Sequence, residues 1–115
     1  MDIEHVESLL WTPVRTKPRR EKKLAEYCQA KNIRYYLPLR KSVKRYEGRT
    51  YVFYPPMFSS YIFCQLDEAK YRDLVVSHAV LFRVSMDELK EKRLVKDLRN
   101  VQIAESSYEE NDLII

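Results

Sequence analysis

Apolar residues recur three and four positions apart in three stretches of the chain, which is the spacing of one face of an α-helix. The repeats are Leu24, Tyr27 and Cys28; Tyr71, Leu74 and Val75; and Leu94, Leu98 and Val101. We expect one helix over residues 19–31, a short one after Asp67, and a third after a capping box of the form S-x-x-E at residues 85–88. Thr16 and Pro18 provide the start signals of the first helix.

Between these helices lie stretches rich in β-branched and aromatic residues, which are typical of strands. They cover residues 9–15, 33–46, 50–54, 58–66 and 79–84. Glu47 and Gly48 form the turn of a hairpin, and Pro55 and Pro56 end its second strand because proline has no N–H to donate. Pro13 lies inside the first strand, which predicts an edge position or a bulge.

The order of these elements, β-α-β-β-β-α-β-α, predicts an α+β fold. We expect a single domain over residues 9–104, with a largely antiparallel sheet of four to five strands flanked by helices. We expect residues 1–8 and 105–115 to be flexible ends.

Composition removes several classes of function. The single glycine, Gly48, excludes glycine-rich phosphate loops of the Walker and dinucleotide types. Two cysteines are too few for a disulfide scaffold or a four-cysteine zinc site. No apolar run approaches the length of a membrane span, and the acidic start lacks the pattern of a secretory signal. We therefore expect a soluble, cytoplasmic domain without a metal or cofactor.

Charge is distributed unevenly along the chain. Residues 1–65 hold 13 Lys and Arg against six Asp and Glu, whereas residues 66–115 hold eight against 11. One basic cluster, RTKPRREKK at residues 15–23, lies at the start of a predicted helix, where a helix dipole already disfavours cations. The second cluster follows the hairpin and consists of Arg40, Lys41, Lys44, Arg45 and Arg49. A solvated surface is the plain interpretation, but the two clusters together favour contact with a phosphate backbone.

Candidate catalytic residues are few. His5 and His78 have no cysteine or carboxylate at a ligand-like spacing, and Cys28 and Cys64 fall in apolar patterns where a small buried thiol is the usual explanation. No nucleophile and base form a motif, so we do not expect an enzyme.

Aromatic residues concentrate in and around residues 58–66. Tyr61 and Phe63 share one strand face, opposite Ser60 and Ile62. Periodicity alone leaves open whether that face is buried or turned outward.

Three blocks of sequence resemble the amino-terminal (NGN) domain of NusG-type transcription factors. Residues 11–22, WTPVRTKPRREK, are similar to the family's W-Y-V-x-x-T-K-P-R-x-E-K opening. Residues 36–39, YLPL, resemble its Y-L-P-L, and residues 57–63, MFSSYIF, resemble its L-F-P-G-Y-V-F. The blocks occur in the family's order, and with the closing strand and helix they cover residues 9–103. A specialised paralogue of the RfaH type fits the same pattern.

The resemblance implies a non-catalytic elongation and antitermination factor of bacterial transcription complexes, at the nucleoid. Such a domain docks on the clamp helices of the largest RNA polymerase subunit, bridges the cleft to the opposite lobe and contacts the non-template and upstream DNA. It implies that the polymerase-binding rings are turned outward. We further expect a monomer, no membrane contact and no KOW domain, although the family usually carries one.

Each implied contact falls on particular residues of this chain. The clamp-binding residues are Phe58, Tyr61 and Phe63, together with Tyr54 and Phe82. The residues near non-template DNA are Lys17, Arg19, Arg20 and Lys23, those facing upstream DNA are Lys44, Arg45 and Arg49, and those at the opposite lobe are Arg72 and Asp73.

Two rival functions follow from the same residues. Residues 47–54 partly match the RNP1 pattern of an RRM-type RNA-binding sheet, in which Tyr51 and Phe53 would stack on bases. A small nuclease is the enzyme-class rival, and cleavage of labelled RNA or DNA with divalent metal would reveal it.

Overall fold

Six strands and three helices form within residues 3–112, the part of the chain that the computed structural model describes; side chains are described for residues 3–105. In chain order these are β1 (Leu10–Thr16), α1 (Glu21–Ala30), β2 (Tyr35–Tyr36), β3 (Ser42–Tyr46), β4 (Arg49–Phe53), β5 (Tyr61–Leu66), α2 (Glu68–Val75), β6 (Val80–Arg83) and α3 (Glu88–Asp112). The α+β prediction is confirmed, and the order differs from it in one segment only.

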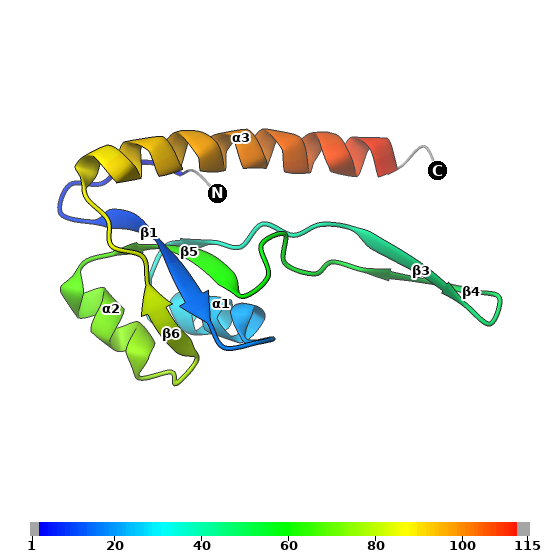
Figure 1. Ribbon diagram of the computed structural model, residues 1–115, viewed down its shortest axis with the longest axis horizontal. Helices are drawn as coiled ribbons and strands as arrows, with labels where there is room; N and C mark the ends of the chain where they lie inside the picture. Colours follow the sequence, from blue (N-terminus) through cyan, green and yellow to red (C-terminus); the bar gives the residue numbers. More distant parts are fainter. Residues whose placement is uncertain (1–2, 113–115) are drawn as a thin grey trace.

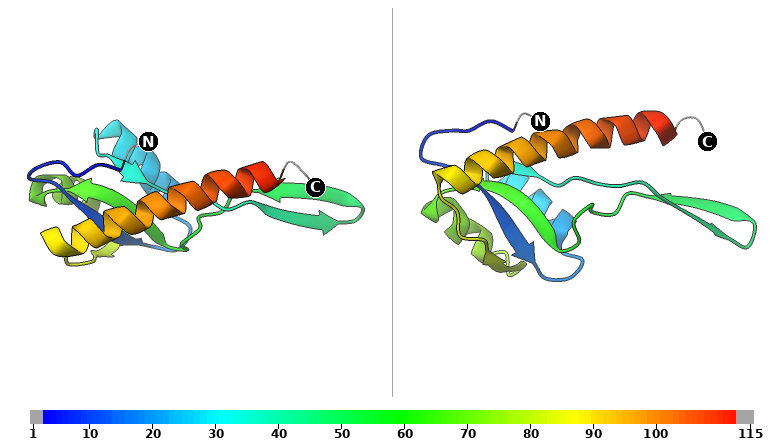
Figure 2. Two further views of the ribbon diagram at one scale, coloured as in Figure 1. Left: turned by 90° about the horizontal axis from the view of Figure 1, so that it is seen from above. Right: turned by 45° about the horizontal axis from the view of Figure 1, so that its top comes forward.

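That segment is residues 33–46, which we expected to form one strand. The segment divides at the buried Pro38. Proline interrupts a strand because it has no backbone N–H to donate to the neighbouring strand. Before the break, β2 pairs with β5; after it, β3 pairs only with β4. The hairpin is therefore a separate two-stranded sheet, and it projects from the body toward the same end of the molecule as the later part of α3 (Figures 1 and 2).

The main sheet is antiparallel, in the order β2-β5-β1-β6. On one face, Leu24 and Cys28 of α1 and Leu74 of α2 pack on residues such as Val14 and Ile62. On the other face, Val95 and Leu98 of α3 pack on a second apolar cluster that consists of Ile3, Trp11, Tyr36 and Phe63. The sheet thus lies between two helical layers, with α3 alone on its side (Figure 1).

Of the two positions predicted for Pro13, the edge is wrong, because β1 lies between β5 and β6. The pairing of β1 with β6 does contain a register shift, but it lies between Arg15 and Thr16. The carbonyl oxygen of Pro13 accepts a hydrogen bond of 2.9 Å from the N–H of Val84, one residue past the end of β6. The N and O of one antiparallel strand residue point to the same side. The missing N–H therefore faces the end of β6, where the ladder stops, and the pairing with β5 is intact.

Two of the expected helix starts also differ. Helix α1 begins after Arg20 without a side-chain cap, since Thr16 is buried in β1 and its hydroxyl donates to the Lys17 carbonyl. Helix α3 is capped by Asp87, which accepts the Lys90 N–H at 2.8 Å, rather than by Ser85. The Asp67 cap of α2 is confirmed by its bond to the Lys70 N–H.

Parts of the two segments expected as flexible ends take part in the fold. Ile3 is buried among the residues beneath α3, and the Glu4 carbonyl accepts hydrogen bonds from the side chains of Trp11 and Gln65. At the other end α3 continues to Asp112. Ile3 thus packs in the cluster beneath α3, and residues 105–112 continue that helix; residues 1–2 and 113–115 lie outside the described part.

Candidate functional site

The sheet face that carries α3 combines aromatic side chains from all four strands of the main sheet. Phe63 pairs with Pro13, and in the next row of that face Arg15 pairs with Tyr61 on β5 and with Phe82 on β6. Cross-strand partners point to the same face of a sheet. Tyr61, Arg15 and Phe82 therefore form a continuous row across β5, β1 and β6.

Helix α3 covers only part of this face. Beneath it, Trp11 is 0% exposed, Tyr36 7% and Phe63 8%. We name these three residues the covered half. The inference from family resemblance that Phe63 is turned outward is thus wrong, because Val95 and Leu98 of α3 pack in the same cluster.

The neighbouring row is not covered. Phe82 is 49% exposed and Phe58 40%, whereas Tyr61 is half-buried. The centres of the Phe58 and Phe63 rings lie 5.7 Å apart and the ring planes are perpendicular, so Phe58 continues the aromatic surface outward from the covered half. We name Arg15, Phe58, Tyr61 and Phe82 the open sheet face.

Arg15 is a member of this surface that sequence reasoning did not single out among the aromatics. Its guanidinium lies 5.0 Å from the centre of the Tyr61 ring. A stacked guanidinium keeps its charge while its flat surface contacts the ring. The signal available in the sequence was its position at the start of the basic segment of residues 15–23, which does not reveal that it stands between Tyr61 and Phe82.

Tyr54, expected on the same surface, lies instead at the base of the hairpin. It lines a hollow of about 460 Å³ together with Leu37, Met57 and the α3 residues Ala104 and Glu105. The Glu105 carboxylate accepts hydrogen bonds from the Tyr36 hydroxyl at 3.1 Å and from the Leu39 N–H at 2.8 Å. Burial, and then the nearby Glu105 charge, raise the pKa of Tyr36. This carboxylate ties α3 to the segment that leads into the hairpin.

The expected DNA-binding cations of the first cluster are exposed, three of them in the turn between β1 and α1 and Lys23 on the first turn of α1. Lys17, Arg20 and Lys23 line a hollow of about 340 Å³ that Tyr27 and His78 share. Arg19 adopts a positive φ of 61° and lines a different hollow, of about 530 Å³, with Lys22 and Phe53. The cations of the basic segment are therefore divided between two separate hollows.

The helix N-terminus beside this segment holds an anion of its own. Glu21, only 5% exposed, accepts the Ser60 N–H at 3.0 Å. A carboxylate in the first turn of a helix also complements the helix dipole. The carboxylate at the start of α1 is thus bonded to the residue before β5, and the cations next to it are exposed.

The second group of expected DNA-binding residues, Lys44, Arg45 and Arg49, is exposed on the hairpin. Tyr51 and Phe53 lie on the same hairpin and not in the four-stranded sheet. An RRM-type module needs its stacking aromatics on the main sheet, so this alternative is not supported. Arg72 and Asp73, the expected opposite-lobe residues, are both exposed on α2.

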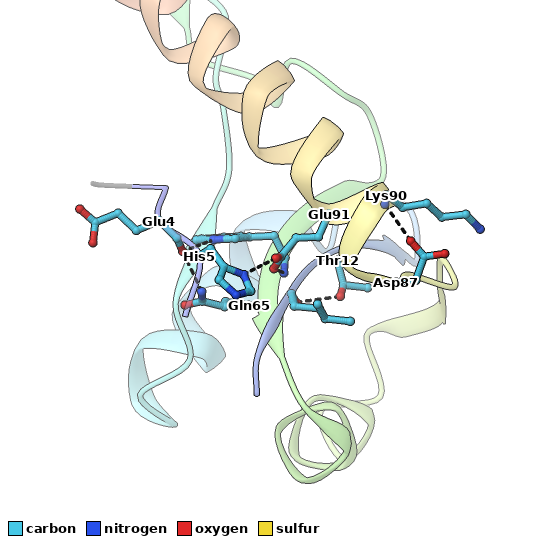
Figure 3. Close-up of polar contacts among 9 residues, drawn as sticks. Glu4, His5, Thr12, Gln65, Asp87, Lys90 and Glu91 are labelled. Atoms are coloured by element: carbon cyan, nitrogen blue, oxygen red, sulfur yellow. Dashed lines mark hydrogen bonds and ion pairs between the residues drawn. The ribbon is translucent and has the colours of Figure 1, made fainter. Parts of the chain in front are cut away.

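A buried carboxylate on α3 organises a polar network that sequence reasoning missed (Figure 3). Glu91, 2% exposed, bonds to His5 Nδ1 and to the Trp11 N–H, each at 2.5 Å. His5 and Glu91 are 86 positions apart, so no spacing rule could pair them. The network attaches the N-terminal segment and α3 to the first residues of β1.

The two cysteines are buried thiols, as expected. Their sulfur atoms lie 3.8 Å apart within the α1-side core, and burial raises the pKa of Cys64. Among the described residues, no group of three or more histidine, cysteine or carboxylate side chains is placed to hold a metal ion.

Comparison with known proteins identifies the family. Residues 9–104 match the NusG family, described as "Transcription termination factor nusG". A comparison with curated proteins gave no match. No helix of the described residues has the length and apolar character needed to cross a membrane. The match spans most of the chain and coincides with the folded body described above, so the chain belongs to the NusG family of transcription elongation and termination factors, which act with RNA polymerase.

Proposed function

We propose that this domain is an elongation and antitermination factor that docks its open sheet face on the clamp helices of the largest RNA polymerase subunit. The observation that carries this proposal is the row Tyr61–Arg15–Phe82, which stands on the sheet beside α3 without a helix over it. Rings that the fold leaves half-exposed in one continuous row are suited to burial against a partner.

The partner surface follows from the chemistry of this row. Phe58, Tyr61 and Phe82 offer apolar area, which fits the apolar stripe of a helix pair. Arg15 places one cation within that area, and a buried cation needs an acid opposite it. The docked helices therefore present apolar side chains around at least one carboxylate.

The basic residues extend this docking onto DNA. Lys17, Arg19, Arg20 and Lys23 lie near the non-template strand, and Lys44, Arg45 and Arg49 on the hairpin face upstream DNA. Contacts to phosphates are independent of base sequence and weaken with salt, which suits a factor that travels with the polymerase. Arg72 and Asp73 on α2 contact the opposite lobe, so that the domain bridges the cleft and favours processive elongation.

The decisive experiment is co-purification of the full chain with core RNA polymerase in the absence of nucleic acid. The isolated clamp-helix coiled coil should compete for the chain and release it from the polymerase. A coiled coil whose acidic surface residues are replaced by glutamine serves as the matched competitor, and it should release less. Binding that the coiled coil does not compete would place the docking surface elsewhere.

A further inference from the structure

The pairing register of the hairpin separates its side chains into two unlike faces. Ser42 pairs with Phe53, Lys44 with Tyr51, and Tyr46 with Arg49, and these alternate pairs share one face. Val43 pairs with Val52 and Arg45 with Thr50 on the other. We name the first set the aromatic hairpin face: it carries three rings and two cations, Tyr46, Tyr51, Phe53, Lys44 and Arg49.

The rings of this face are exposed and do not pack in the apolar cores of the domain. Tyr46 is 67% exposed, and Tyr51 and Phe53 are each 43% exposed. None of the three is among the residues of the two apolar clusters that hold the sheet to its helices. Three large exposed rings on one side of a projecting hairpin therefore need an explanation other than packing.

Cations alternate with these rings along the face. The Lys44 ammonium lies 5.6 Å from the centre of the Phe53 ring, and Arg49 is the cross-strand partner of Tyr46. Successive residues on one strand face are separated by about 7 Å. The face thus repeats ring and positive charge over the length of the hairpin, which is the arrangement that binds bases by stacking and phosphates by charge.

At its base the aromatic hairpin face continues into the basic segment of the body. Phe53 lines the hollow of about 530 Å³ that is also lined by Pro18, Arg19 and Lys22. Segments far apart in the sequence, the turn before α1 and the end of β4, therefore border one hollow. The aromatic hairpin face, through Phe53, and the first basic cluster, through Arg19 and Lys22, therefore meet at this hollow and form a continuous track of cations and rings.

We propose that this track, the aromatic hairpin face together with Arg19 and Lys22, binds single-stranded DNA by stacking unpaired bases on Tyr46, Tyr51 and Phe53. The choice of DNA rests on the proposed function, in which the domain lies beside an exposed DNA strand. Unpaired bases offer free π-faces, whereas the bases of a duplex are already stacked on one another. Of the three hairpin cations assigned to upstream DNA, Lys44 and Arg49 thus belong to this single-strand track, and Arg45, on the opposite face, is left to contact duplex phosphates.

The test measures binding of a labelled short oligothymidylate to the full chain by fluorescence anisotropy over a range of salt. The single strand should bind more tightly than a duplex of equal length and than oligouridylate. Tyr51→Leu keeps an apolar residue in the hairpin but removes the ring, and it should weaken single-strand binding about five-fold or more. Tyr46→Leu should act in the same direction.

Two neighbouring cations provide the matched control. Lys44 and Arg45 are adjacent in sequence but lie on opposite faces of the hairpin. Lys44→Gln should flatten the log–log salt dependence by about 0.7 for the lost phosphate contact, and Arg45→Gln should leave single-strand binding nearly unchanged. Equal effects of the two variants, with no effect of Tyr51→Leu, would mean diffuse attraction to charge and would overturn the proposal.

Two further outcomes are decisive. Tighter binding of oligouridylate would assign the track to RNA and refute the DNA ligand. A preference for the duplex would refute stacking. Co-purification of Tyr51→Leu with core polymerase separates this proposal from docking: the variant should bind polymerase as the wild type does, whereas failure of docking would leave oligothymidylate binding intact.

Discussion

The covered half and the open sheet face lie side by side on one surface and have opposite exposures. Phe63, beneath α3, is 8% exposed, whereas Phe82 is 49% exposed. Both belong to the same antiparallel sheet and point to the same side of it. Strand geometry therefore does not distinguish them. The difference arises because α3 covers Phe63 and does not cover Phe82. An aromatic strand face therefore indicates that it will be covered, but not whether the cover is a helix of the same chain or another protein.

Helix α3 is held in place by polar contacts as well as by its apolar residues. Glu91 binds the Trp11 N–H, the Arg99 side chain donates to the Ile3 carbonyl at 3.0 Å, and Glu105 binds Tyr36 and Leu39. These contacts occur along much of the helix. They fix the position of α3 and thereby which rings it covers. They therefore also define the border of the open sheet face.

The largest difference should appear in stability. Phe63→Ala leaves a cavity beneath α3 and should lower the free energy of unfolding by about 3–5 kcal/mol. Phe82→Ala, on the open sheet face, should lower it by less than about 1 kcal/mol. Urea unfolding of the two variants measures both values, and equal losses would show that the two regions are not distinct.

Polymerase binding should show the reverse order. Phe82→Ala or Tyr61→Ala should weaken binding to core polymerase about 30-fold or more if either ring is a hot spot. Leu89→Ala, which removes a 62% exposed apolar side chain from α3, is the control and should bind normally. Retention of full affinity by both ring variants would place docking on another surface.

Glu91 links the covered half to α3, and its removal should be costly. Glu91→Ala leaves the buried Trp11 N–H without its acceptor and should lower the free energy of unfolding by about 1–3 kcal/mol. Glu88→Ala, at an exposed position of the same helix, should change it by less than about 0.5 kcal/mol. Thermal or urea unfolding of the pair tests the network.

The basic turn beside the open sheet face should affect DNA binding alone. Arg19→Ala combined with Arg20→Ala should weaken single-strand binding and flatten its log–log salt dependence by about 1.4 if both phosphate contacts are lost. Lys92→Ala with Lys96→Ala changes the net charge equally on α3 and should have a smaller effect. A salt dependence identical to that of the wild type would exclude the two arginines from the contact.

The smallest effect concerns the pH dependence of the contact between Tyr36 and Glu105 of α3. The pKa of Tyr36 is raised in the folded chain, first by burial and then by Glu105, while an unfolded tyrosine ionises near pH 10. Its contribution to stability is therefore present below that pH and is lost as the pH rises above it. Tyr36→Phe should cost about 1 kcal/mol at neutral pH, and the difference from wild type should shrink above pH 10 in denaturant titrations. A constant difference across that range would contradict the shift.

Much of the fold was predictable from local pattern. The helical repeats at Leu24 and Leu74 place both helices on the core that the structure shows, and Asp67 caps its helix as expected. The break at Pro38 was not predicted, because the residues on both sides favour extended backbone and only pairing partners reveal that β2 and β3 belong to different sheets. The edge position predicted for Pro13 was wrong for a related reason. This proline is tolerated in the middle of a sheet because the neighbouring strand ends opposite it.

The candidate site was predictable in its residue types and less so in its membership. The sequence by itself determined that rings and cations would gather in a few segments, since composition and period-two alternation are local properties. Only the tertiary structure decided that Phe63 belongs to the core, that Arg15 stands between Tyr61 and Phe82, and that His5 reaches Glu91. The first and the third depend on the position of α3, which comes after every strand in the chain, and the second depends on the strand order β5-β1-β6. Both the helix position and the strand order are set by contacts between residues far apart in the sequence.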